Sequence, residues 1–321
     1  MKKFLKKFKI VNSFYEIYIG ISEFLFKILS KVVSFFSNSK IVRRLVFNLL
    51  PINKDFYLDT IYGNFILNTN SRIISKKSYY SKTPYSSKSL IKVFKILEKE
   101  NIDIDIFVDV GANVGTTSIA SAYLNSNLDV LCIEGNSSNY SYLVKNIKLN
   151  NLENKVTAIN SLVGESDNQR YFVEFVEEKG CSKVFNDLDE LKRYQKKYKF
   201  NIKDSNLVTT VSLVSLLKNN LDKNLFIWLD LEGIDLEIIY GRLTEYLFPI
   251  YFEFNPSFYK FKYKNLDKYI SKVEQYIIDC GYSFYYAEGF SFEKKEITPG
   301  FLNQITKKIG LNKGSENILI I

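Results

Sequence analysis

The sequence contains no histidine, only three cysteines and only five prolines. Histidine is the commonest general base near neutral pH and the commonest metal ligand, so its absence excludes a histidine-dependent triad and disfavours a metal site. Proton transfer must then fall to Asp, Glu, Lys, Tyr or Cys side chains. Cys132, Cys181 and Cys280 form no closely spaced pair, which indicates a reducing, cytoplasmic location.

Long uncharged apolar runs are also missing. Two glutamates and two lysines interrupt the apolar residues of positions 1–36, so this region is too polar to span a bilayer. Its apolar residues still recur every three or four positions from Ile10 to Phe35, which predicts an amphipathic helix behind a basic start. Two interpretations follow: residues 1–36 lie peripherally on the inner membrane surface, or the helix packs on the following domain.

Net positive charge is small beyond the first fifty residues. The net charge is +9, of which +8 falls in residues 1–50 and +1 in residues 51–321. Nucleic-acid enzymes need clustered cations for phosphate contacts, so we expect no nucleic-acid partner. The charge and the apolar periodicity predict a basic helical extension over residues 1–50. The length fits one further α/β domain over 51–321, with its core starting near residue 88.

The rest of the chain alternates between strand and helix patterns. A hairpin is expected over residues 56–68 with Gly63-Asn64 at its turn, and a charged, irregular insertion over residues 165–207. Helices are expected over 88–99, 115–124 and 137–150, and strands over 105–110, 129–134, 155–160, 225–230, 249–254, 281–289 and 316–321. This alternation predicts an α/β fold with a doubly wound, mostly parallel, seven-stranded Rossmann-like sheet.

The segment "IFVDVGANVGTTSIA" (106–120) reads as a buried strand, a glycine turn and a helix. A turn at the end of a first parallel strand is where α/β sheets bind nucleotides. A dinucleotide site requires a third glycine, whereas Gly111 and Gly115 are alone here and Asp109 precedes them. That carboxylate disfavours a pyrophosphate but suits the cationic amino group of S-adenosylmethionine, which we therefore expect as cofactor.

The following strand ends support the same cofactor. Glu134 ends the second strand about 20 residues after the glycine turn, where an acid accepts ribose hydroxyls. Asn113 and Asn136 are expected to assist, and Asn160 and Ser161 are expected beside the adenine ring. The alternative is an ordinary strand-to-helix turn with an exposed glutamate.

The segment "FIWLDLEGID" (226–235) places three carboxylates after a buried strand. Because the chain has no histidine, Asp230 or Glu232 is the expected base that orients an acceptor. Acids at a helix N-terminus offer a second explanation for Glu232 and Asp235. Oxygen ligands for a divalent cation are a third, although nothing in the spacing requires a metal.

Several segments together resemble the FkbM-type methyltransferases over about residues 60–321. The resemblance rests on "FVDVGANVG", "LVKNIKLNNLENKVTAIN", "LFIWLDLEGIDLEIIYG" and "IYFEFNP", in that order. It implies S-adenosylmethionine-dependent O-methylation of a hydroxyl on a sugar or glycoconjugate, such as a lipid-linked glycan. The alternative is a catalytically inactive cofactor-fold module that docks in glycan assembly.

The resemblance also assigns an acceptor side to the site. It carries Asp230 and Glu232 onto an acidic block and Glu253 onto a later strand end. Asn255 and Trp228 lie close to these positions in the sequence, so we include them among the acceptor-binding residues. Trp228 departs from the family pattern, which usually has a lysine there.

Overall fold

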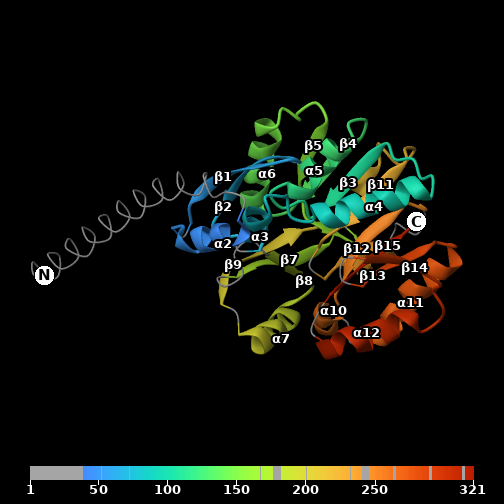
Figure 1. The fold of residues 1–321 in the computed structure, drawn as a ribbon. Coiled ribbons are helices and arrows are strands. Elements are labelled where there is room, and N and C mark those ends of the chain that lie inside the picture. Colours follow the sequence, from blue (N-terminus) through green and yellow to red (C-terminus); the bar gives the residue numbers. More distant parts are fainter. Residues whose placement is uncertain are drawn as a thin grey trace, which may run out of the picture.

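The computed structural model describes most of the chain from residue 39 onward (Figure 1). The described residues are 39–321 without 52, 72, 167, 176–181, 200, 232, 241–245, 263–264, 289–290 and 313–314. The predicted helix of residues 10–35 and its membrane contact therefore lie outside the described residues. Among the helices that are described, none has the length and apolar character needed to span a membrane.

The core of the molecule is an eight-stranded sheet with the order β14-β13-β15-β12-β11-β3-β4-β5. Strands β5, β4, β3, β11 and β12 are parallel, whereas β15 and β14 run antiparallel to their neighbours. The strands are β3 (Ile106–Val110), β4 (Asp129–Glu134), β5 (Val156–Asn160), β11 (Leu225–Leu229), β12 (Ile250–Phe254), β13 (Phe284–Glu288), β14 (Ser291–Lys295) and β15 (Glu316–Ile320). The predicted mostly parallel, Rossmann-like fold is confirmed, with β14 as an additional edge strand.

Helices cover both faces of this sheet, because alternate residues of each buried strand point to opposite sides. Phe107 and Phe226 face one helical layer, and Val108 and Ile227 face the other. The first layer consists of α4 (Ser87–Lys99), α5 (Thr116–Leu124) and α6 (Ser137–Leu149). The second consists of α8 (Leu213–Leu217), α9 (Asp235–Tyr240), α10 (Pro256–Lys262), α11 (Leu266–Asp279) and α12 (Phe301–Asn312).

A hairpin precedes the sheet and packs on the first helical layer. It consists of β1 (Asp55–Thr60) and β2 (Gly63–Asn68), flanked by α2 (Lys40–Leu49) and α3 (Ile74–Ser81). Thr60 pairs with Gly63, so the turn residues are Ile61 and Tyr62, and the predicted Gly63-Asn64 turn is wrong. Gly63 is needed for packing instead, because a Cβ there would lie 2.7 Å from Ile119 Cγ2 on α5.

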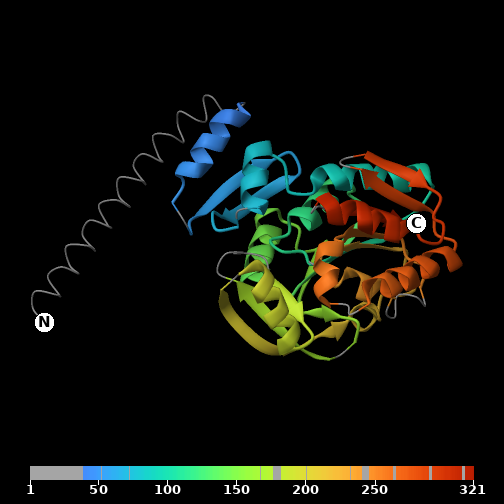
Figure 2. The same cartoon turned by 90° about the horizontal axis from the view of Figure 1, so that it is seen from below.

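The insertion predicted to be irregular is an ordered antiparallel sheet. It contains β7 (Gln169–Phe175), β8 (Ser182–Phe185) and β9 (Ile202–Thr209), with α7 (Leu188–Tyr198) beside them. The short parallel pair β6 (Val163–Gly164) and β10 (Val211–Ser212) joins it to the main domain. The prediction failed because β9 exposes most of its side chains and carries no alternating pattern. Figures 1 and 2 show α2 and the hairpin (blue) on the side of the molecule opposite the C-terminal strands (red).

Candidate functional site

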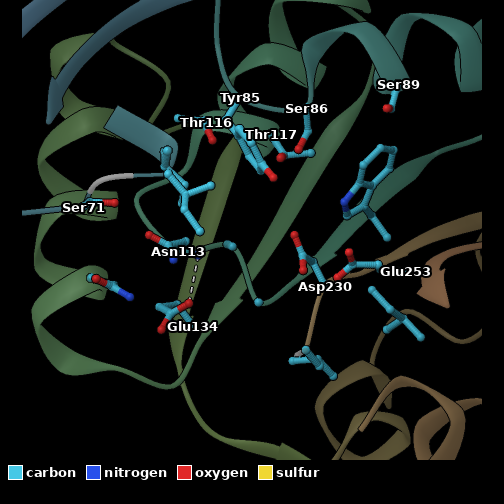
Figure 3. Close-up of a pocket in the computed structure, with 18 of the residues that line it drawn as sticks. Ser71, Tyr85, Ser86, Ser89, Asn113, Thr116, Thr117, Glu134, Asp230 and Glu253 are labelled. Carbon is cyan, nitrogen blue, oxygen red and sulfur yellow. Dashed lines mark hydrogen bonds between the residues drawn. The ribbon is translucent and has the colours of Figure 1, made fainter. Parts of the chain in front are cut away.

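A cavity of about 1150 Å³ lies where the parallel strands end. Residues that follow β3, β4 and β11 form its floor, among them Gly111, Gly135 and Asp230. Helix α3, the α3–α4 connection and the first turn of α4 contribute the opposite wall. The carboxyl edge of a parallel sheet is the usual place for a ligand in this class of fold, so this cavity is the candidate site (Figure 3).

The glycine turn after β3 brings two strand ends together. Gly111 has φ +89°, and a Cβ on it would lie 2.2 Å from the backbone oxygen of Asp230. Only glycine allows this approach, since a side chain would push the ends of β3 and β11 apart. Asn113 has φ +53°, which aims its backbone N–H at the Glu134 carboxylate.

The Glu134 carboxylate is held by the backbone on both sides. Its Oε2 accepts from the Asn113 N–H at 2.8 Å, as Figure 3 shows, and its Oε1 accepts from the Asn136 N–H at 2.7 Å. The Asn139 side chain also hydrogen-bonds to it, while burial raises its pKa. A carboxylate offers about four acceptor positions, so one remains for a ribose hydroxyl.

Asn136 and Asn160 fix the loop around Glu134. Asn136 Oδ1 accepts from two backbone N–H groups at the start of α6, and its Nδ2 donates to Glu174 Oε1 at 2.6 Å. Asn160 Nδ2 donates to the backbone oxygen of Glu134 at 2.7 Å. Asn136 and Ser161 line the cavity and Asn160 does not, so Asn160 supports the strand end from outside.

Two predicted cofactor residues lie behind the turn. Asp109 is 1% exposed and accepts a hydrogen bond from the Ser118 hydroxyl on α5, so direct contact with the cofactor's amino group does not fit its position. Burial raises its pKa to about 7. Gly115 does not line the cavity either: a Cβ added to it would point away from the cavity lining and lie 2.6 Å from Leu143 Cδ1. Both residues position the turn rather than line the cavity.

The predicted acceptor residues gather at the other end of the cavity. Asp230 follows β11, Glu253 lies on β12, and Figure 3 shows the two carboxylates side by side. The Ser315 hydroxyl donates to Glu253, and Asn255 lines the same region. Trp228 is 2% exposed and stacks on Tyr251, with ring centroids 3.6 Å apart. The structure thus brings together Asp230, Glu253, Asn255 and Trp228.

Two predicted acidic residues of the segment 226–235 remain, Glu232 and Asp235. Glu232 lies outside the described residues. Asp235 is 1% exposed and accepts from the backbone N–H groups of Leu231 and Gly233, and burial raises its pKa to about 7. Asp235 therefore has a structural role at the start of α9, where its carboxylate holds the preceding loop, although these two contacts are not those of a helix cap. Among the residues that the structure describes, no three His, Cys, Asp or Glu side chains converge as metal ligands.

One wall of the cavity was not predicted from the sequence. It is rich in hydroxyl groups and carries lysines: Ser71, Tyr85, Ser86, Ser89, Thr116, Thr117, Lys40, Lys77 and Lys88. The signal was present in "SYYSKTPYSSKS" (78–89), where serines, lysines and a proline interrupt the helical pattern. Ser86 has φ +67°, an uncommon conformation for a residue other than glycine and one that clusters at functional sites.

The site residues fit S-adenosylmethionine. Gly111 lets the ends of β3 and β11 meet at the floor of the cavity, and Glu134 is oriented to accept a ribose hydroxyl. The hydroxyl groups of the cavity wall offer neutral hydrogen-bond partners for the cofactor's polar atoms. Glu134, Gly111, Asn113, Asn136 and Ser161 would thus hold this cofactor.

Comparison with known proteins gives one family match. Residues 70–182 match the sequence model described as the TRM5/TYW2 methyltransferase domain. No curated protein sequence matches the chain.

Solved structures resemble the chain only distantly. M. jannaschii TYW2 in complex with AdoMet is 12% identical, with 84% of this chain and 86% of that chain covered and a TM-score of 0.39. Trm5b from Pyrococcus abyssi is 12% identical, with 84% and 56% covered and a TM-score of 0.39. A precorrin-6y C5,15-methyltransferase from Geobacter metallireducens GS-15 is 16% identical, with 70% and 84% covered and a TM-score of 0.34. Similarities at these TM-scores are too weak to support a conclusion about this chain.

The family match overturns the resemblance to FkbM-type methyltransferases and, with it, the expected sugar or glycan acceptor and the expected role in glycan assembly. TRM5/TYW2 enzymes are tRNA methyltransferases, so the expectation of no nucleic-acid partner is contradicted as well. That expectation averaged the charge over residues 51–321, although residues 51–100 carry +5 and residues 101–321 carry −4. The cofactor prediction is confirmed: the chain is an S-adenosylmethionine-dependent methyltransferase.

Proposed function

We propose that the protein transfers a methyl group to a base of an RNA acceptor. The observation that carries this proposal is the match of residues 70–182 to the TRM5/TYW2 methyltransferase domain. The matched segment includes the glycine turn, Glu134 and all the hydroxyl-bearing residues of the cavity wall, but not Lys40. The proposal therefore concerns the same cavity that fits the cofactor.

The charge around the cavity supports an RNA acceptor. Lys40, Lys77 and Lys88 line it from α2, α3 and α4, on the wall opposite the carboxylates. Lysines at the mouth of a site can contact phosphates while the base enters the cavity. Exposed cations elsewhere in residues 39–100, such as Arg44 and Lys82, extend this positive region.

The aromatic and acidic end of the cavity suits a planar base. The stacked Trp228 and Tyr251 rings and the Phe258 side chain contribute apolar surface there. Asp230 and Glu253 can accept hydrogen bonds from ring N–H or amino groups. Such contacts hold a base in one plane and one orientation relative to the cofactor, which is a large part of catalysis in a transfer between two bound molecules.

Asp230 is the residue that we expect to handle the proton. When bound, the cofactor supplies a methyl group on a positively charged sulfur. Asp230 follows directly on β11, and its backbone N–H is fixed to the Val110 oxygen at 3.0 Å. Its carboxylate can accept the proton that the acceptor atom loses as the new bond to the methyl group forms.

A transfer assay tests the proposal. The full chain is incubated with S-adenosylmethionine carrying a tritiated methyl group and with a cell extract, which is then treated with ribonuclease, protease or neither. We expect ribonuclease to release the label from the acid-insoluble fraction and protease to leave it there. Digestion of the labelled RNA to nucleosides, followed by chromatography, identifies the methylated base.

Two outcomes would contradict the proposal. Label that survives ribonuclease would place the acceptor in another class of molecule. Label in RNA that separates with the ribose, and not with a base, would overturn base methylation. A mock preparation from cells that do not express the protein, assayed in parallel, reports any transfer that comes from contaminating enzymes.

A further inference from the structure

Tyr251 lies at the acceptor end of the cavity, and only its ring, not its hydroxyl, has been given a role so far. It is on β12, directly opposite Trp228 of β11 in the parallel register. The two rings are nearly parallel, with an interplanar angle of 18°. Tyr251 is 5% exposed and still lines the cavity. The stack therefore fixes the ring, and the phenol has a defined place in the cavity wall.

The Tyr251 hydroxyl connects the floor of the cavity to its opposite wall. It hydrogen-bonds with the hydroxyl of Ser89, which lies in the first turn of α4. Asp230, Glu253 and Tyr85 are the other polar groups whose charges act on it. Figure 3 shows Ser89 and Tyr85 on one side of the cavity and the two carboxylates on the other.

These surroundings make the phenol a hydrogen-bond donor. Burial and the two nearby carboxylates raise the pKa of Tyr251 well above 10, so it stays protonated at any pH at which the protein works. If Ser89 donates to the phenol oxygen, the phenol proton is available for a bound molecule. Asp230 and Glu253, when ionised, are acceptors only. The acceptor end then offers one neutral donor beside two acceptors.

We propose that Tyr251 is an acceptor-binding residue, whose hydroxyl donates a hydrogen bond to an oxygen or unprotonated ring nitrogen of the molecule that receives the methyl group. That molecule must then present such an atom next to the N–H or O–H groups that face Asp230 and Glu253. The proposal rests on the proposed function for the location of the acceptor end, but not on the acceptor being RNA.

The Tyr251→Phe variant tests this inference, because it removes the hydroxyl and keeps the ring that stacks on Trp228. Tyr285→Phe is the matched control: Tyr285 is 4% exposed and hydrogen-bonds to Glu100, and it does not line the cavity. Both variants lose one hydroxyl from a buried tyrosine in the same sheet. A difference between them therefore reports on the cavity and not on the stability of the sheet.

The assay measures methyl transfer at a series of extract concentrations, without fractionation, so that it does not depend on the class of acceptor. For Tyr251→Phe we expect the extract concentration at half-maximal rate to rise about fivefold to tenfold, with cofactor affinity by calorimetry and the urea midpoint close to wild type. Tyr285→Phe should leave the half-maximal concentration unchanged. Ser89→Ala should raise it by a smaller factor.

A second readout uses the single tryptophan of the chain. Because Trp228 lies in the cavity, its fluorescence should change when the four ribonucleoside 5′-monophosphates are added one by one in the presence of the demethylated cofactor. We expect the responding nucleotide to bind Tyr251→Phe more weakly by a similar factor.

The inference is overturned if Tyr251→Phe has a half-maximal concentration within twofold of wild type. It is equally overturned if Tyr251→Phe and Tyr285→Phe are impaired alike, or if Tyr251→Phe loses cofactor affinity to the same extent. Ribonuclease-resistant label would contradict the RNA proposal alone, because the comparison between the two variants would stand.

Discussion

Glu134 shows, at the scale of one residue, how the backbone holds the carboxylate that we propose as a cofactor contact. Its two oxygens receive backbone N–H groups from Asn113 and Asn136, so the carboxylate needs no rearrangement to accept a ribose hydroxyl. Glu134→Ala removes this acceptor and takes away the carboxylate to which the N–H groups of Asn113 and Asn136 donate. We expect cofactor affinity to fall by roughly 1–3 kcal/mol, measured by calorimetry. Unchanged affinity would place the ribose elsewhere in the cavity.

Asp230 should affect chemistry more than binding. Asp230→Asn keeps the shape of the side chain and removes its charge, so cofactor affinity should change little. Turnover should fall about 10²-fold or more if Asp230 takes the proton. Asp222→Asn, at an exposed position, is the matched control. Turnover of Asp230→Asn within about threefold of wild type would mean that positioning alone carries the reaction.

Asp109 makes stability depend on pH. Burial raises its pKa from 3.8 to about 7, so the folded protein holds a proton there that the unfolded chain releases. The stability from this group is therefore greatest at low pH and is lost as the pH rises through 7. Between pH 5 and pH 8, Asp109→Asn should gain about 2 kcal/mol in unfolding free energy relative to wild type. Urea unfolding at both pH values measures this, and a constant difference would contradict it.

Several site residues could be predicted because the carboxyl ends of parallel strands meet at one edge. Asp230 and Glu134 were selected in this way, whereas Glu253 came from the family resemblance, and all three line the cavity. The direction of a side chain could not be predicted. Asp109 has the spacing of a cofactor residue, yet its carboxylate meets Ser118 behind the turn.

At the scale of elements, the turn between β3 and α5 combines two different steric constraints. Both glycines have positive φ: a Cβ on Gly111 would lie 2.2 Å from the Asp230 backbone oxygen, and a Cβ on Gly115 would lie 2.6 Å from Leu143 Cδ1 of α6. Leu143 Cδ1 can move, whereas a backbone oxygen in a strand end cannot do so easily. The two glycines therefore differ in what a substitution disturbs.

We expect Gly111→Ala to destabilise the fold by roughly 2 kcal/mol or more and to impair activity further by displacing Asp230. Gly115→Ala should be less destabilising and should retain measurable cofactor binding. Gly281→Ala is the matched control, since Gly281 has φ +70° with nothing within 4 Å of a Cβ. Gly281→Ala should cost only the free energy of placing alanine at a positive φ, about 1–2 kcal/mol. Equal urea midpoints for all three variants would contradict the steric argument.

Buried strands with apolar sequences could be predicted, and exposed strands at the edges of the sheets could not. Strands β3 and β11 are buried along their whole length and stand out as apolar runs. Strands β9 and β14 expose most of their residues, so their sequences carry little of the apolar pattern that marks a strand. Strand β9 pairs with β7 across the intervening β8 and α7, and such pairing cannot be recognised within a short segment, whereas β14 is an edge strand that pairs only with the adjacent β13.

At the scale of the whole molecule, charge is distributed unevenly, and a single net value hides this. The basic excess of residues 39–100 lies on α2, α3 and α4, and three of its lysines reach the cavity. The acidic excess belongs to the later part of the chain, which contributes Asp230 and Glu253. An acceptor with phosphates and a base would meet both signs of charge, each at its own end of the cavity.

With RNA as the proposed acceptor, this arrangement predicts how the binding of RNA would respond to salt. Replacing Lys40, Lys77 and Lys88 with glutamine removes up to three phosphate contacts. The slope of log K against log salt should then become shallower by about 2, since each contact to single-stranded RNA contributes about 0.7. The measurement is fluorescence anisotropy of a labelled RNA from the acceptor fraction, between 50 and 300 mM salt as roughly the range over which such contacts are lost.

A second triple variant separates local contacts from overall charge. Lys218, Lys223 and Lys268 are exposed and do not line the cavity, and their replacement with glutamine changes the net charge by the same amount. If the lysines at the cavity contact phosphates, only the first variant changes the slope, because counterions are released where phosphates are bound. If both variants weaken binding equally and share one slope, long-range attraction to the whole molecule is sufficient. The RNA would then have to approach the cavity by another face.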